Sequence, residues 1–352
     1  MQLQFLSYSL RLRHVFSITG SSRTETPVVF VRLFAGGSYG YGEASLPPYL
    51  PETQGTVTSF LNSLDLRQFK DAADTETIMT YVNSCEEGNL AAKASVDIAL
   101  HDLKGELEQR PLWQVVHSEP SRMPDTSCTL GIDTLEAMKT KLAETVPYKI
   151  LKIKLGGPDD KQVVELIRTR TFKPLCADVN QGWKDKHEAL DMLWFLKDQG
   201  FKFVEQPLPK EKIKEMIWLS ENSPLPLIAD ESCQTVKDIE ALHGIFRGIN
   251  IKLMKCGGII EARKMIDLAQ KLDMKILFGC MNESSCGILA AAALAPQCNW
   301  ADLDGPFLTA NNPFEDVPLA NGKLVLSTRP GLGLAEKRGI DEAINWSTAI
   351  SR

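Results

Sequence analysis

The sequence lacks a long hydrophobic run. Its longest apolar stretch, Ile288 to Ala295, is far too short to span a bilayer. The first eight residues alternate like a strand and contain no apolar segment of the kind found in a secretory signal peptide. We therefore expect a cytoplasmic protein with no membrane partner.

Clusters of cysteine and histidine are also missing. None of the eight cysteines forms a C-x-x-C pair, and the five histidines show no H-x-x-x-H spacing. We therefore expect neither a zinc site nor a disulfide framework. A block of like charges is absent too, and the net charge of −6 argues against a nucleic-acid partner.

Residues 1–122 mix strand and helix patterns, which predicts an α+β domain. Pro27–Leu33 and Ser38–Glu43 are typical of a hairpin, and apolar residues recur at helical spacing over Leu90–Leu107. The stretch from Ser17 to Thr26 is polar and has no clear period, so we predict a mobile loop there.

From about residue 125, short apolar strands alternate with helical segments, and the strand ends are 22 to 28 residues apart. This rhythm predicts a (β/α)8-type barrel of parallel strands over residues 123–309. The tail, residues 310–352, is rich in Gly and Pro and should return to pack on the first domain. The eight predicted strands end near Leu130, Lys154, Asp178, Glu205, Asp230, Lys252, Cys280 and Asp304.

The run Leu151-Lys152-Ile153-Lys154-Leu155 alternates apolar residues with lysines, as a strand does. Its two lysines therefore share one face. Two ammonium groups on a buried face repel each other and lose hydration, which predicts lowered pKa values and lysines able to act as bases near pH 7. The alternative is the solvated face of an edge strand, where lysine is common.

Carboxylates end three consecutive strands, at Asp178, Glu205 and Asp230. The carboxyl ends of barrel strands meet at one mouth, so these side chains should converge. Oxygen ligands without His or Cys suit a hard divalent ion, and we predict one Mg²⁺ per subunit. Each acid taken alone could instead cap the following helix, but three in succession favour a metal site.

Strands two and six of an eight-stranded barrel are diametrically opposed. Lys154 and Lys252 should therefore face each other across the mouth, with the metal between them. Asp302 and Asp304, on strand eight, should lie opposite strand four and attract a cation such as an ammonium. Lys255 has the wrong strand parity to point inward with Lys252 and is expected in a loop.

These groups suit the removal of a proton from a carbon next to a carboxylate. A divalent ion and the Lys152 ammonium would stabilise the resulting enediolate. One lysine would take the proton from one face, and the other would return a proton to the opposite face. The predicted result is inversion of the α-carbon without an organic cofactor.

Together these residues resemble the muconate-lactonising subgroup of the enolase superfamily, in which a Lys or His base works with Mg²⁺. The resemblance covers nearly the whole chain. It implies a (β/α)7β TIM-type barrel with an α+β N-terminal capping domain whose loops close over the site. The motifs that carry it in the barrel are Lys152-Ile153-Lys154, Asp178 to Trp183, Val204 to Pro207, Ala229 to Ser232 and Asn250 to Gly258, and those in the capping domain are Tyr41 to Ala44 and Ala94 to Gly105.

Asp302-Leu303-Asp304-Gly305-Pro306 looks like the dipeptide epimerases of this subgroup, in which the aspartate pair holds the substrate ammonium. By resemblance, Thr129 and Cys280-Met281-Asn282 line the pocket. Alanyl-glutamate epimerases carry an arginine in the first capping loop, whereas here that position falls near Ser21, with Arg23 two residues later. The resemblance therefore implies an epimerase that inverts the C-terminal residue of Ala-X dipeptides, with X small or apolar, as in Ala-Ala or Ala-Val, rather than strictly Glu.

Other interpretations stay open. An o-succinylbenzoate synthase, N-succinylamino-acid racemase or muconate cycloisomerase would use the same lysines, although its substrate carries no free ammonium for Asp302 and Asp304. An acid-sugar dehydratase would need a histidine within Ile276–Cys280, which has none. A dipeptide-binding protein without activity would not need two bases. A homo-oligomer is possible, since closed symmetric oligomers are the default assembly.

Overall fold

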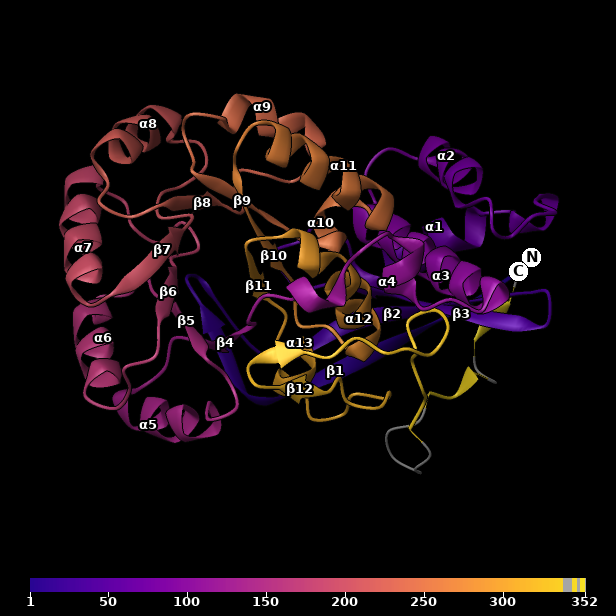
Figure 1. The fold of residues 1–352 in the computed structure, drawn as a ribbon, viewed down its shortest axis with the longest axis horizontal. Coiled ribbons are helices and arrows are strands. Elements are labelled where there is room, and N and C mark those ends of the chain that lie inside the picture. Colours follow the sequence, from indigo (N-terminus) through magenta and orange to yellow (C-terminus); the bar gives the residue numbers. More distant parts are fainter. Residues whose placement is uncertain (338–343, 347–348, 352) are drawn as a thin grey trace.

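Eight parallel strands, hydrogen-bonded in chain order, form the larger part of the molecule (Figure 1). The computed structural model describes residues 1–337, 344–346 and 349–351. An isolated parallel bridge between Thr126 and Ala301 brings the two edges of the sheet together, so the sheet curls into a barrel. The strands are β4 (Ser127–Leu130), β5 (Ile150–Lys154), β6 (Leu175–Asp178), β7 (Phe201–Glu205), β8 (Leu227–Ala229), β9 (Gly248–Ile251), β10 (Lys275–Gly279) and β11 (Trp300–Asp302).

Helices connect each of these strands to the next, which confirms the predicted barrel architecture. The predicted ends of the first four strands coincide with those of the structure, and the last four lie one or two residues beyond them. The connecting helices are α5 (Leu135–Glu144), α6 (Asp160–Arg168), α7 (Lys186–Asp198), α8 (Ile213–Asn222), α9 (Ile239–Leu242), α10 (Leu253–Cys256), α11 (Ile259–Lys271) and α12 (Ser285–Leu294), and α13 (Gly305–Leu308) follows β11.

A separate antiparallel sheet and a group of helices lie beside the barrel (Figure 1). The sheet has the order β14-β1-β2-β3, with β1 (Gln2–Ile18), β2 (Ser21–Ala35), β3 (Ser38–Ser45) and β14 (Ile350–Ser351). The helices are α1 (Gln54–Ser63), α2 (Thr75–Cys85), α3 (Leu90–Glu108) and α4 (Leu112–Val115). This arrangement confirms the α+β capping domain.

The predicted mobile loop at Ser17–Thr26 is wrong. β1 continues to Ile18 and β2 begins at Ser21, with Phe16 opposite Arg23 across the hairpin. The segment has polar side chains on both faces, which removed the period-two signal. Its backbone is nevertheless paired because the strands extend beyond the buried part of the sheet.

The tail contacts both parts of the chain. β14 pairs with β1 through Phe5 and Ile350, whereas the Gly322 carbonyl accepts from the Thr126 backbone N–H at the amino end of the barrel. β12 (Leu319–Ala320) and β13 (Lys323–Leu324) form a small hairpin of their own. The division at residues 122 and 309 stays a prediction.

Four 3₁₀ helices are described: Leu66–Gln68, Pro120–Arg122, Val236–Asp238 and Ala295–Gln297.

Within the described residues, no helix combines the length and the apolar composition needed to cross a membrane. The eight cysteines are all free thiols, as predicted.

Helix α3 packs directly against β3 and also contacts α10 and α11 of the barrel. This close packing depends on glycine at position 42, where an added Cβ would overlap the carbonyl oxygen of Ser95. The backbone of β3 therefore packs directly on the backbone of α3 within the capping domain.

We expect Gly42→Ala to lower the free energy of unfolding by about 3 kcal/mol, because a methyl group there forces β3 away from α3. Gly55→Ala is the matched control, since the added methyl would meet only the Thr53 hydroxyl at 3.6 Å. That control should stay within about 1 kcal/mol of the wild type. Urea unfolding of the three proteins measures both values, and equal midpoints for all three would contradict this packing.

Candidate active site

A cavity of about 520 Å³ opens at the carboxyl ends of the barrel strands. Its floor comes from the barrel and its rim from the capping domain, including Phe16, Arg23 and Tyr49. All the substrate-binding and lysine positions predicted from the sequence line it, as does Asp230.

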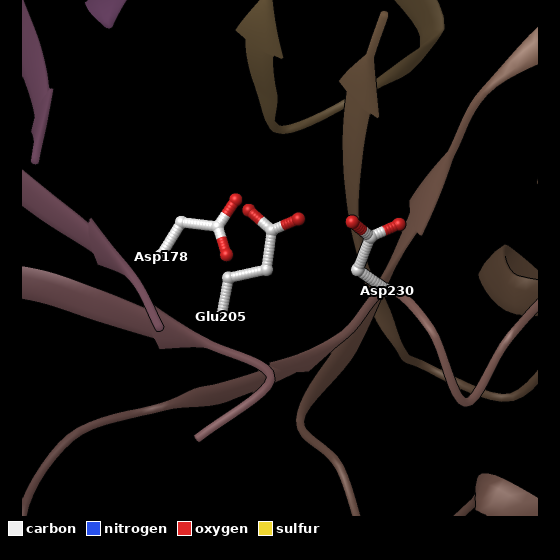
Figure 2. Close-up of side chains that lie close together, drawn as sticks. All are labelled: Asp178, Glu205 and Asp230. Carbon is white, nitrogen blue, oxygen red and sulfur yellow. The ribbon is translucent and has the colours of Figure 1, made fainter. Parts of the chain in front are cut away.

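Three buried carboxylates meet on the barrel side of this cavity. Asp178 ends β6, Glu205 ends β7, and Asp230 directly follows β8. Asp178 and Glu205 are paired in register, and one ligand oxygen from each of the three residues lies within 4.8 Å of the others. Figure 2 shows the three carboxyl groups side by side. The convergence expected from the strand ends is therefore present.

Four lysine ammonium groups surround these acids. Two of the four lie at opposite ends of the row of three carboxylates. Lys154 Nζ lies 2.6 Å from Asp178 Oδ2, at one end. Lys252 Nζ lies 2.7 Å from Asp230 Oδ2, at the other end. The two lysines therefore flank the carboxylate group from opposite ends, as predicted.

Lys152 occupies the centre of the site. Its Nζ lies 2.7 Å from Asp302 Oδ2, 2.8 Å from Glu205 Oε2 and 3.1 Å from Asp178 Oδ2. One ammonium thus joins carboxylates from β6, β7 and β11.

The lowering of pKa predicted for the lysines of the Leu151–Leu155 strand is wrong for Lys152. Burial alone would lower the pKa of Lys152, but the charges of Asp178, Asp302 and Glu205 raise it well above the ordinary value. The pKa of Lys252 is raised in the same way, mainly by Asp230 and then Glu205 against the effect of burial. The prediction counted repulsion between lysines on one strand and missed carboxylates that lie closer on other strands.

Lys255 is not the loop residue that strand parity predicted. It lies in α10, is buried, and its Nζ lies 2.5 Å from Asp230 Oδ1. The same Nζ donates to the backbone carbonyls of Asp230, Cys233 and Asn250 at 2.8 to 3.0 Å. The strand ends at Ile251, and beyond it the helical period applies, in which residues three apart share a face. The spacing from Lys252 to Lys255 would have indicated this if a helix had been predicted there.

The two aspartates of strand eight differ in their surroundings. Asp302 contacts Lys152 and accepts from the Ser127 hydroxyl at 2.5 Å. Asp304 accepts from the Thr129 backbone N–H at 2.6 Å, and in the described part of the chain it has no basic partner within 4 Å. Burial and then the charge of Asp302 raise the pKa of Asp304 to about 7. Of the two aspartates, Asp304 is therefore the one that has no cationic partner in the described structure.

The capping domain contributes Ser21 and Arg23 from β2. Arg23 lies over the rings of Phe16 and Tyr49, at 5.0 and 5.4 Å from their centroids, and donates to the Asn282 side-chain oxygen. At the tip of the hairpin, the Thr19 hydroxyl lies 3.0 Å from the Val179 carbonyl oxygen, at the end of β6. The hairpin thus rests on the barrel at the edge of the cavity.

Cys280, Met281 and Asn282 line the cavity and lie in the chain between β10 and α12. Glu43 of β3 is hydrogen-bonded to the residues that directly follow this segment. The Ser284 hydroxyl and backbone N–H and the Gly287 backbone N–H all donate to its carboxylate at 2.6 to 3.2 Å. A residue of the capping domain therefore fixes one wall of the barrel's pocket.

Two family models match the sequence. Residues 5–116 match the mandelate racemase/muconate lactonizing enzyme N-terminal domain, and residues 133–339 match the enolase C-terminal domain-like model. The chain belongs to the mandelate racemase/muconate lactonizing enzyme family. The resemblance to the enolase superfamily inferred from the sequence is thereby confirmed.

Relatives within this family are named as epimerases. The chain is 47% identical to an L-Ala-D/L-Glu epimerase of Bacteroides thetaiotaomicron, over 95% of this chain and 88% of the relative. It is 33% identical to an L-Ala-D/L-amino acid epimerase of Pedosphaera parvula, over 94% and 97% of the two chains. A dipeptide epimerase of Enterococcus faecalis, solved with Mg and the dipeptide L-Leu-L-Tyr, has a TM-score of 0.87 and 31% identity, over 95% and 99% of the two chains.

The acid triad of this family member fits a divalent cation. Its donors are three carboxylates with no His or Cys, which suits Mg²⁺. Despite the lysines, burial and then the charge of Asp178 raise the pKa of Glu205 to about 8. The negative charge at the site is therefore incompletely neutralised. Asp178, Glu205 and Asp230 would hold the ion, which would supply positive charge for developing carboxylate oxygens.

We expect Mg²⁺ to stabilise the protein more at pH 8 than at pH 5.5. The raised pKa of Glu205 means that the folded, metal-free protein holds a proton that the unfolded chain has lost, so its unfolding free energy falls as the pH rises from about 4.5 to 8. Mg²⁺ requires the ionised carboxylate, so its stabilising effect grows over the same range. Thermal unfolding should show an Mg²⁺-induced rise in Tm that is about 5 °C larger at pH 8.

Glu205→Gln should remove both most of the Mg²⁺ effect and its pH dependence. Asp102, Glu231, Asp304 and Glu283 also titrate in this range, because burial raises their pKa values to about 7 or 8. The Glu205→Gln variant keeps all four groups, so a pH dependence of the Mg²⁺ effect that it loses belongs to Glu205. An Mg²⁺ shift that is equal at both pH values would contradict the assignment of Glu205.

Proposed function

We propose that this protein is an Mg²⁺-dependent dipeptide epimerase that inverts the α-carbon of the C-terminal residue of Ala-X dipeptides. The observation that carries the proposal is the placement of Lys154 and Lys252 at opposite ends of the acid triad. A carbon held between them presents one face to each lysine. One Mg²⁺ per subunit and no organic cofactor are then sufficient.

The reaction needs a proton removed from one face and a proton added to the other. In one direction the neutral amine of one lysine takes the α-proton, and the ammonium of the other returns one. In the reverse direction the two lysines exchange roles. Lys152, whose pKa its carboxylate neighbours raise, stays an ammonium and stabilises the enediolate charge.

Asp304 favours a substrate with a free ammonium. Asp302 is already neutralised by Lys152, so the unpaired charge at this end of the pocket belongs to Asp304. A dipeptide ammonium would satisfy it, with Thr129 and the Cys280–Asn282 segment beside it. The substrates of an o-succinylbenzoate synthase, N-succinylamino-acid racemase or muconate cycloisomerase carry no such group, so these alternatives remain less favoured.

Arg23 bears on the identity of X. Its stacking against Phe16 and Tyr49 places two aromatic rings at the cap side of the pocket, which suits a small or apolar side chain. Its Nη1 atom is buried and has no hydrogen-bond partner in the described structure, which favours a carboxylate as a second kind of X. We therefore propose that Ala-Ala and Ala-Val are substrates and that Ala-Glu is accepted through Arg23. Cytoplasmic location and assembly into a homo-oligomer stay predictions from the sequence.

Lys154→Ala and Lys252→Ala should each lower the rate of epimerisation about 10³-fold, because each removes one of the two proton carriers. Each variant should still exchange the α-proton of one epimer for deuterium in D₂O, and the two variants should retain opposite epimers. Proton NMR of the L,L and L,D dipeptides measures both. Lys202→Ala, on the outer face of β7, is the matched control. Full activity of both pocket variants would rule out the two-base mechanism.

Arg23→Met should lower kcat/KM for Ala-Glu at least about tenfold more than for Ala-Val, since only the glutamate side chain offers a carboxylate to the guanidinium. Polarimetry with the two dipeptides gives both values. An equal loss for both substrates would mean that Arg23 only supports Asn282 and the pocket wall.

A further inference from the structure

Lys154 has a second hydrogen-bond partner that the proposed reaction does not use. Its Nζ donates to the side-chain oxygen of Asn180 at 3.1 Å, and the Asn180 side-chain nitrogen donates to Glu231 Oε1 at 3.2 Å. All three side chains line the cavity. A short chain of hydrogen bonds thus runs along the pocket wall from the lysine to a carboxylate.

The orientation of the amide is forced by its two neighbours. An ammonium can only donate, so the amide oxygen must face Lys154, and the amide nitrogen is left to donate to Glu231. The other partner of Lys154 is Asp178, a proposed metal ligand whose charge would be shared with the ion. Asn180 is therefore the partner that has no other assigned role.

The backbone holds Asn180 in place as well. Asn180 and Gln181 both adopt left-handed conformations, with φ of 46° and 65°. The Asn180 N–H donates to Asp178 Oδ1 at 3.1 Å, and the Gln181 N–H donates to the Gln206 carbonyl at 2.8 Å. Asparagine tolerates this conformation better than most residues do. Two consecutive left-handed residues beside a reacting group indicate a position that the surrounding structure has to fix.

The opposite lysine has different surroundings. Within the described structure, the Lys252 ammonium donates to Asp230 and has no hydrogen bond to an amide side chain. Asp230 is shared in turn with Lys255. A lysine hydrogen-bonded to an amide that in turn donates to a carboxylate is therefore found on the Lys154 side of the pocket.

We propose that Asn180 and Glu231 are positioning residues for Lys154, and that they govern proton transfer on one face of the substrate only. Glu231 orients the Asn180 amide, and the amide oxygen aims the lysine nitrogen at the α-carbon. The inference rests on the proposed two-base epimerisation and goes beyond it by giving the two faces separate supports.

The test measures α-proton exchange of the two epimers separately in D₂O, by proton NMR, with Mg²⁺-loaded protein. Lys154→Ala and Lys252→Ala first show which epimer depends on which lysine. Asn180→Gly removes the amide and keeps a residue suited to the left-handed backbone. Asn321→Gly is the matched control, because Asn321 is an exposed asparagine with φ of 51° in the turn between β12 and β13.

We expect Asn180→Gly and Glu231→Leu to slow exchange of the Lys154-dependent epimer about tenfold, with the Lys252-dependent epimer within about twofold of the wild type. Glu231→Gln keeps an oxygen that accepts from Asn180 and should restore most of the rate lost in Glu231→Leu. Mg²⁺ affinity, measured by calorimetric titration, should be unchanged in these variants.

Equal losses for both epimers, weaker Mg²⁺ binding, or no loss at all would each overturn the positioning role. These outcomes differ from a failure of the proposed function. If Lys154→Ala and Lys252→Ala show no opposite dependence on the epimer, the two-base reaction itself fails, whatever the Asn180 variants do.

Discussion

The ion pairs of Lys152 are the interaction on which the rest of the site depends. This buried ammonium reaches carboxylates on β6, β7 and β11 from its position on β5, and so ties together strands from both halves of the barrel. A buried charge that loses its partner costs several kcal/mol, so neither the lysine nor the acids could be kept in this place alone. The alternation of β5 also puts Lys154 on the same face. The position of one proposed base is therefore set by the strand that carries the central ammonium.

The pocket is formed by both the barrel and the capping domain. Chemistry-bearing groups come from the barrel strands, whereas Arg23, Phe16 and Tyr49 of the cap form the rim. Glu43 goes further, because its carboxylate accepts from the amino end of α12 and so fixes the Cys280–Asn282 wall. A change in the cap can therefore alter which dipeptide fits while the lysines and acids stay in place.

The sequence predicted most of the barrel and the charged residues of the site, because both follow from simple periods. The rhythm of strands and helices located the strand ends within two residues, and alternation put Lys152 and Lys154 on one face. Lys255 was misplaced because strand parity was applied after β9 had ended and α10 had begun. The Ser17–Thr26 hairpin was missed because its polar residues show no buried face. The raised pKa values of Lys152 and Lys252 arise from residues 22 to 150 positions away in the chain, and no local pattern reports such neighbours.

A reaction that runs in both directions at one carbon sets a further constraint on these charges. The two lysines have to hold opposite protonation states, and the states have to exchange when the direction reverses. Lysines that shared one carboxylate would be coupled, so that deprotonating one would strengthen the hold on the other's proton. Here Lys154 is paired with Asp178 and Lys252 with Asp230, at opposite ends of the triad. Glu205 lies between these acids, and its one ion pair in the described part of the chain is with the central Lys152. Each lysine thus has its own carboxylate acceptor, so the loss of a proton from one leaves the ion-pair partner of the other in place.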